Sequence, residues 1–136
     1  YEYIHWSDGS RDFGTFMWNI LEASGERRAP AGVLSAYPGD SVARFDSYGI
    51  TYQDVADHDG FAMPGAWEVR ATRGEESLTY RATVRRIMTS TGRKGYGYGD
   101  FLLDCEGTYS GPGGEKALKG RGRTEYIAKS HNPVAQ

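Results

Sequence analysis

The sequence feature that most constrains the fold is an alternation of apolar and polar side chains with a period of two residues. Residues 67–72 read Trp-Glu-Val-Arg-Ala-Thr, and residues 80–85 read Tyr-Arg-Ala-Thr-Val-Arg. Runs of this kind, bounded by Gly, Pro and Asp, recur along the chain, whereas helical spacing is nearly absent. The pattern predicts an all-β protein.

Glycine use supports the same fold class. The chain has 19 Gly and ten Tyr among 136 residues, and this glycine content is about twice the usual ~7%. Some glycines mark turns, and others lie within strands, where Gly95, Gly97 and Gly99 alternate with Tyr96 and Tyr98. Such a strand has one bare face, which allows another segment to approach closely.

The end of the chain predicts one hairpin in detail. Gly111-Pro112-Gly113-Gly114 is a turn, and placing Ser110 opposite Glu115 sets the register of both strands. This register pairs opposite charges twice, Asp104 with Arg121 and Glu106 with Lys119. It also places Asp100 opposite Glu125 and Cys105 opposite Gly120.

Shorter strands are expected over residues 1–6, 12–23, 32–37, 41–45 and 49–53, with a tight turn at Asp8-Gly9 and a bulge at Arg86-Ile87. Residues 12–23 are apolar on both faces, so a second domain or subunit is expected to cover one of them. Residues 54–66 lack periodicity and predict a long loop able to cap a cavity. The predicted domain spans residues 1–129, and residues 130–136 form a flexible tail.

Composition narrows the class of protein. The length of 136 residues suits one domain. A formal charge of −2 with a pI near 5.9 gives no electrostatic reason to expect nucleic-acid binding. Cys105 is the one cysteine, so no internal disulfide forms and a reducing, cytoplasmic location is expected. No apolar run is long enough for a membrane helix. Because the chain starts at Tyr1 rather than Met, we expect a processed chain or a piece of a longer one.

Two weaker motifs point elsewhere. Residues 94–101, Lys-Gly-Tyr-Gly-Tyr-Gly-Asp-Phe, resemble the aromatic octamer of RNA-recognition domains, but glycine and proline leave no room for the helices of that fold. RNA binding is therefore the less favoured alternative. Asp54, Asp57, His58 and Asp59 cluster in the long loop without the spacing of a calcium site. We expect no metal and no cofactor.

The closing hairpin resembles a known family. Residues 106–111, Glu-Gly-Thr-Tyr-Ser-Gly, and residues 118–126, Leu-Lys-Gly-Arg-Gly-Arg-Thr-Glu-Tyr, resemble the last two strands of the lipocalin-like carotenoid hydratase (hydroxyneurosporene synthase) family. The similarity covers about 25 residues, and Cys105 and Arg123-Thr124 depart from the usual residues. Members resemble two tandem barrels, so the resemblance implies a single antiparallel lipocalin-like β-barrel equivalent to the carboxyl-terminal one.

The resemblance further implies an apolar ligand of isoprenoid or polyketide type and, in some relatives, its acid-catalysed hydration or cyclisation. Protonating an alkene needs an acid in a dry pocket, and a buried carboxyl with a raised pKa suits that role. The candidate acids are Asp100, Glu125 and Glu106, with Asp104 in the same hairpin. The candidate ligand-binding rings are Phe16, Trp18, Tyr80, Tyr96 and Tyr98.

Two interpretations stay open at this point. One is a barrel that catalyses hydration or cyclisation, and the other is a non-catalytic barrel that binds a ligand or forms a subunit interface. The predicted cross-strand pairs favour a structural role for Asp104 and Glu106. Asp100 is the better acid, because a facing carboxylate at Glu125 repels it unless one of the two holds a proton or both face water.

Overall fold

The computed structural model describes residues 2–7, 12–18, 32–36, 43–91 and 96–129, and every regular element among them is a β-strand. The strands are β1 (Glu2–Ser7), β2 (Asp12–Trp18), β3 (Gly32–Ala36), β4 (Ala43–Arg44), β5 (Ser47–Gln53), β6 (Ala56–His58), β7 (Phe61–Met63), β8 (Ala66–Arg73), β9 (Glu76–Thr91), β10 (Tyr96–Gly111) and β11 (Gly114–Lys129). The all-β prediction is confirmed. No helix in the described ranges could cross a membrane.

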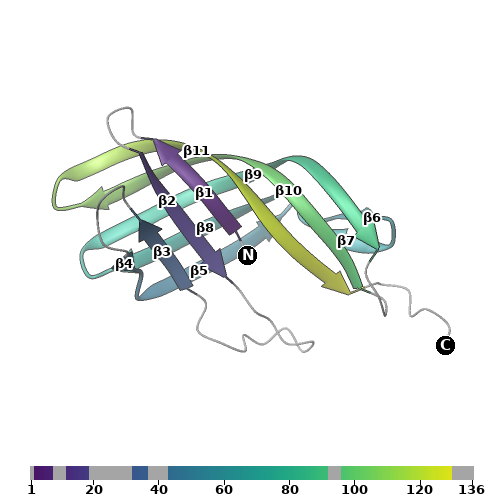
Figure 1. Cartoon of the computed structure of the whole chain (residues 1–136). Helices are drawn as coiled ribbons and strands as arrows, with labels where there is room; N and C mark the ends of the chain where they lie inside the picture. Colours follow the sequence, from purple (N-terminus) through teal and green to yellow (C-terminus); the bar gives the residue numbers. More distant parts are fainter. Residues whose placement is uncertain (1, 8–11, 19–31, 37–42, 92–95, 130–136) are drawn as a thin grey trace.

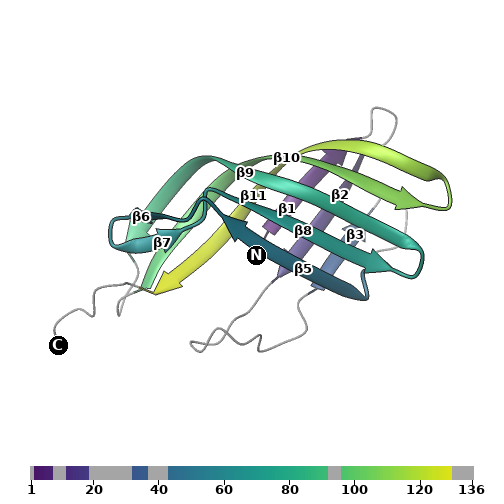
Figure 2. The same ribbon diagram turned by 180° about the vertical axis from the view of Figure 1, so that it is seen from behind.

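Nine of the strands form one antiparallel sheet in the order β4-β3-β2-β1-β11-β10-β9-β8-β5, and β6 pairs with β7 in a separate hairpin. The three long strands β9, β10 and β11 curve, so that β1, β2 and β3 lie across from β8 and β5 (Figures 1 and 2). The ladder ends at β4 and β5, and no hydrogen-bonded pairing joins those two ends among the described strands. The sheet is therefore strongly folded over, without an observed closure.

The closing hairpin has the register that the sequence predicts. Ser110 pairs with Glu115, Asp104 with Arg121, Glu106 with Lys119 and Asp100 with Glu125. The ladder between β9 and β10 shifts between Leu102 and Leu103, where Arg86 and Val84 are the respective partners. Arg85 is the extra residue, so the predicted bulge lies within one residue of its expected place.

Large rings on the inner face of the sheet sit opposite glycines. Tyr80 pairs with Gly107, and Trp6 pairs with Gly120. A Cβ added at Gly120 would lie 2.6 Å from the Trp6 ring, and one added at Gly107 would lie 2.6 Å from the Cβ of Tyr80. Gly120 is needed because it leaves the space that the Trp6 ring occupies, and Gly107 because it lets the backbone of β9 approach closely at Thr79 and Tyr80.

The core lies between the two folded-over parts of the sheet and is rich in aromatic residues. Its members include side chains from β1, β7, β8, β9, β10 and β11 that are almost fully buried: Ile4, Trp6, Met63, Trp67, Val69, Leu78, Tyr80, Phe101, Leu103, Cys105 and Leu118. Because β1 pairs with β11, this core joins the first and last strands of the chain.

The structure differs from the sequence prediction in one segment and leaves others undescribed. Residues 54–66 are not an irregular loop, because they contain the β6–β7 hairpin. Positive φ angles at Asp59 (56°) and Gly60 (85°) form its turn, and the Gly60 amide donates to Asp57 Oδ1. The predicted Asp8-Gly9 turn, residues 19–31 and the tail at 130–136 lie outside the described residues.

Candidate functional site

A carboxyl group that sequence analysis did not single out lies inside the protein. Burial alternates along β1, so that Glu2, Ile4 and Trp6 point inward while Tyr3 and His5 point outward. The side chain of Glu2 is 2% exposed. The signal was present in the sequence, because Glu2 is in phase with Ile4 and Trp6 on a strand of period two.

Two aromatic donors hold the Glu2 carboxyl. The Trp67 indole Nε1 donates to Oε2 over 2.7 Å, and the Tyr80 hydroxyl donates a short hydrogen bond to Oε1. These donors come from adjacent strands, since Trp67 lies on β8 and Tyr80 on β9. Trp6 packs edge-on against Tyr80 with ring centroids 5.1 Å apart. The carboxyl therefore has two polar partners in otherwise aromatic surroundings.

Burial changes the protonation of this cluster. Loss of water raises the pKa of Glu2 from 4.5 to about 7, although the hydrogen bonds from Tyr80 and Trp67 oppose the rise. Burial, followed by the charge of Glu2, raises the pKa of Tyr80 well above its usual value. The pKa of the Cys105 thiol is also raised, mainly by burial and then by Glu2. Near neutral pH Glu2 is the group in this cluster that can gain or lose a proton.

Four rings next to this carboxyl form a closed circuit of contacts, here called the aromatic quartet. The ring centroids of Tyr52 and Trp67 are 6.2 Å apart, those of Trp67 and Phe101 6.2 Å, those of Phe101 and Tyr126 5.8 Å, and those of Tyr126 and Tyr52 5.7 Å. Trp67 belongs to both the quartet and the Glu2 cluster. The carboxyl that can hold a proton is thus hydrogen-bonded to the N–H edge of one ring of the quartet, in a core rich in aromatic residues.

The carboxylates predicted as acids lie on the opposite, outer face of the sheet. Arg123 donates to both oxygens of Asp100, with distances of 2.6 Å and 2.5 Å. Glu106 and Glu125 are exposed, and Arg121 lies 3.7 Å from Asp104. The predicted repulsion between the facing carboxylates of Asp100 and Glu125 is reduced, because Arg123 lies diagonally opposite Asp100 and neutralises its charge. Their proposed roles remain predictions, but their surroundings are not dry.

The predicted ligand-binding rings are divided between the two faces. Tyr80 is buried in the Glu2 cluster, whereas Tyr98 is 38% exposed on the outer face, opposite Ile127. The side chains of Phe16, Trp18 and Tyr96 lie outside the described part of the structure. An exposed Tyr98 is one of the features that RNA binding requires, but the side chain of Tyr96, the second ring of that motif, is not among those described.

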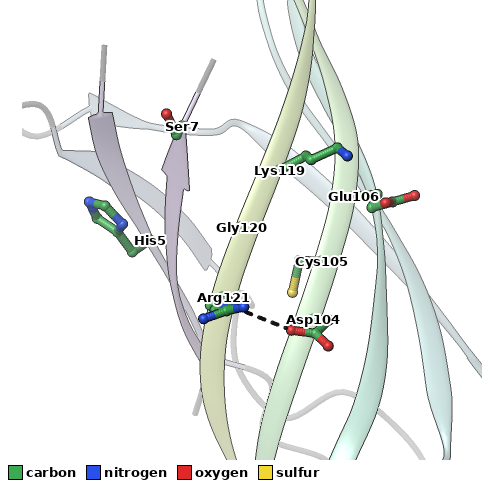
Figure 3. Close-up of a pocket in the computed structure, with 8 residues that line it drawn as sticks. All are labelled: His5, Ser7, Asp104, Cys105, Glu106, Lys119, Gly120 and Arg121. Carbon is green, nitrogen blue, oxygen red and sulfur yellow. Dashed lines mark ion pairs between the residues drawn. The ribbon is translucent and has the colours of Figure 1, made fainter. Parts of the chain in front are cut away.

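A groove of about 520 Å³ lies on the outer face across β1, β11 and β10 (Figure 3). Four of its lining side chains, Asp104, Glu106, Lys119 and Arg121, belong to the oppositely charged cross-strand pairs of the hairpin. His5 and Ser7 line it from β1. The groove is charged and open to water, so it suits ions better than an apolar molecule.

The acidic segment at residues 54–59 does not gather into a metal site. The carboxylate of Asp54 lies 3.5 Å from Arg81, and Asp57 accepts the Gly60 amide. In the described ranges no three His, Cys, Asp or Glu side chains come together in a way that holds a metal ion.

Comparison of the chain with protein-family models, with curated proteins and with solved structures finds no match. The residues of the site are therefore the basis for a functional assignment.

Proposed function

We propose that this chain is a lipocalin-like barrel that binds an apolar small molecule of isoprenoid or polyketide type beside the aromatic quartet and Glu2. The observation that carries the proposal is the fully buried Glu2 carboxyl, held by Trp67 and Tyr80 with a pKa near 7. A closed barrel requires the two ends of the sheet to approach. In support of this, Cα atoms of β3 and β5 come within 8 Å of each other.

The same cluster supports acid catalysis on such a ligand. Protonated Glu2 would transfer its proton to one carbon of an alkene, leaving a cation at the other carbon that the faces of Trp6 and Trp67 stabilise. Water then forms the new C–O bond, and its extra proton returns to the Glu2 carboxylate. Atoms balance as alkene plus water to alcohol, and no cofactor is consumed. In a cyclisation, a second double bond of the ligand would attack the cation to form the new C–C bond, and the resulting cation would lose a proton to the Glu2 carboxylate, giving a cyclic alkene isomeric with the ligand.

Binding is tested with retinol, an isoprenoid alcohol, by following the quenching of tryptophan fluorescence. We expect saturable binding, and we expect Glu2→Gln to change the affinity. Asp104→Asn is the matched control, because it makes the same carboxyl-to-amide change on the exposed outer face. Native mass spectrometry of freshly purified protein should also detect a bound small molecule. Failure of both measurements would contradict the proposal.

Catalysis is tested separately by incubating the protein with an isoprenoid alkene in water labelled with a heavy oxygen isotope. We expect the label in the alcohol product, with a rate that falls as pH rises through about 7, because the acid must be protonated. Loss of the product in Glu2→Gln, but not in Asp104→Asn, would assign the proton donor. Equal rates in the two variants would remove Glu2 from the mechanism.

A non-catalytic subunit-forming barrel is the second candidate, and the outer face favours it. Large apolar side chains are exposed there on β9, β10 and β11, with Met88 43% exposed, Tyr98 38%, Leu102 39% and Ile127 53%. Sedimentation velocity of the wild type and of Leu102→Glu distinguishes the candidates. A dimer that dissociates in the variant would support the subunit role, and a monomer in both would exclude self-association through this patch.

A further inference from the structure

The β6–β7 hairpin covers one end of the inner face of the sheet. Pairing of β8 with β9 ends at Ala66 and Thr83, and among the described residues the last pair of β1 with β11 in this direction is Glu2 with Thr124. Beyond these points the described sheet consists of β9, β10 and β11 alone, and the hairpin lies against this three-stranded end (Figures 1 and 2). We call β6, β7 and the turn between them the cap hairpin.

Two apolar side chains attach the cap hairpin to bare glycine backbone. Phe61 is 7% exposed and lies over Gly97, where an added Cβ would be 2.6 Å from the ring. Met63 is fully buried, and its sulfur is 3.0 Å from the position of a Cβ on Gly99. The cap hairpin forms its own two-stranded sheet rather than joining the large one. Its contact with β10 is therefore made by packing.

The base of the cap hairpin is anchored differently. The Gly65 amide hydrogen bonds to the carbonyls of Gln53 and Asp54, and the Val84 amide donates to the Gly65 carbonyl over 2.8 Å. Asp54 has a positive φ of 54°, which turns the chain out of β5. The hairpin is thus fixed to the sheet at its base, by backbone hydrogen bonds at Gly65 and by the packing of Met63, while its turn end is held by Phe61. This is the geometry of a hinged flap.

The cap hairpin packs next to one ring of the proposed binding site. Met63 and the ring of Phe101 both contact the space above Gly99. Phe101 belongs to the aromatic quartet, whose Trp67 donates to Glu2. Raising the hairpin would expose this end of the quartet to water. Phe61 and Met63 therefore belong to the same packed apolar cluster as Phe101 and Trp67, and Trp67 reaches the buried carboxyl.

We propose that the cap hairpin is a lid that opens about its base to admit and release the apolar ligand, an inference that rests on the proposed function. Opening breaks the packing of two side chains and leaves the nine-stranded sheet intact. An isolated two-stranded hairpin is only marginally stable in water, so the raised lid also loses its own hydrogen bonds. Amide exchange across residues 56–63 therefore reports each opening event.

Opening is measured first without ligand, by hydrogen–deuterium exchange with mass spectrometry on the wild-type protein. We expect residues 56–63 to exchange much faster than residues 101–107 in the centre of β10, through local opening. Retinol should slow exchange of the hairpin. If the hairpin exchanges as slowly as the centre of β10, the lid is refuted, and this measurement needs no variant.

Entry is then measured by stopped-flow fluorescence with retinol. Phe61→Ala removes one of the two attachments, and we expect both association and dissociation rates to rise by roughly tenfold to a hundredfold, the effect of losing most of one buried aromatic contact. Gly97→Ala should act in the same direction, because its Cβ displaces the Phe61 ring. Val55→Ala is the control, since Val55 precedes β6 and is 58% exposed.

The outcomes separate the two proposals. Retinol binding with rates that neither Phe61→Ala nor Gly97→Ala alters refutes the lid and leaves the proposed function standing. If retinol does not bind but the hairpin exchanges fast, the proposed ligand class is refuted. The exchange result then decides by itself whether the cap hairpin opens. A rate increase in Val55→Ala equal to that in Phe61→Ala would show a general loosening and would also refute the lid.

Discussion

Replacing Glu2 by Gln should change how the stability of the protein depends on pH. The neutral form of the carboxyl and the amide have similar shapes, and each can accept the hydrogen bond from Trp67. The amide, however, has no proton to lose. The substitution therefore removes the ionisation of Glu2 while keeping most of its packing.

The sign of the effect follows from the direction of the pKa shift. The pKa of Glu2 is about 7 in the folded protein and near 4.5 in the unfolded chain. Between these values the unfolded chain releases its proton while the folded protein keeps it, so the free energy of unfolding decreases as pH rises. Below pH 4.5 the stabilising effect is fully present, and above about pH 7 it is lost.

The shift corresponds to about 3 kcal/mol in total, because each unit of pKa is worth about 1.4 kcal/mol. Most of this difference falls between about pH 4.5 and about pH 7. The hydroxyl of Tyr80 and the thiol of Cys105 face the same cluster, but their pKa values are raised above this window.

The assay is urea denaturation of wild type and Glu2→Gln at several pH values. We expect similar unfolding free energies at about pH 4 and a variant more stable by about 3 kcal/mol at about pH 8, with an unchanged m-value. Asp104→Asn should follow the wild type. Parallel curves for wild type and Glu2→Gln across the whole range would refute the buried, neutral carboxyl.

Three further predictions use the same reasoning. Tyr80→Phe removes a hydrogen bond that lowers the pKa of Glu2, so the carboxyl should titrate above about 7, as followed by carbon NMR of the labelled side chain; a lower value would contradict the assigned bond. Gly120→Ala should reduce the unfolding free energy by about 1–3 kcal/mol, because its Cβ would overlap a ring of β1, whereas Gly49→Ala, which has open space, should not. Asp100→Asn should leave the urea midpoint and any hydration activity almost unchanged, because this carboxyl forms an ion pair with an exposed arginine. Loss of hydration activity in this variant would instead identify Asp100 as the proton donor.

Much of the sheet was predictable because hairpin register is a local property. The turn at residues 111–114 and the charge pairs Asp104–Arg121 and Glu106–Lys119 agree on one alignment, and the structure has that alignment over the whole length of β10 and β11. The alternation of apolar and polar residues at 67–72 and 80–85 likewise predicted strands β8 and β9. The structure of residues 54–66 was harder to predict, because two strands of three residues each are too short to establish a period.

The site was less predictable, because the interior of a curved sheet is defined by strands far apart in the chain. Asp100 looked like the better acid in its hairpin, yet a diagonal arginine on the outer face neutralises it. Glu2 looked like an ordinary residue at the start of a strand. Its importance appears only when β1 pairs with β11 and brings it to Trp67 and Tyr80, which are more than 60 residues away.

The sequence by itself therefore determined the fold class, the closing hairpin and the strand faces that glycine leaves bare, since period, turn residues and cross-strand charge act between near neighbours. Tertiary structure decided which face became the interior. That choice placed one carboxyl in a dry aromatic environment and raised its pKa, left the predicted acids in water, and set the cap hairpin over Gly97 and Gly99. The period of β1 aligns Glu2 with Ile4 and Trp6, but the donors that surround its carboxyl come from strands far away in the chain and are brought to it only by the whole sheet.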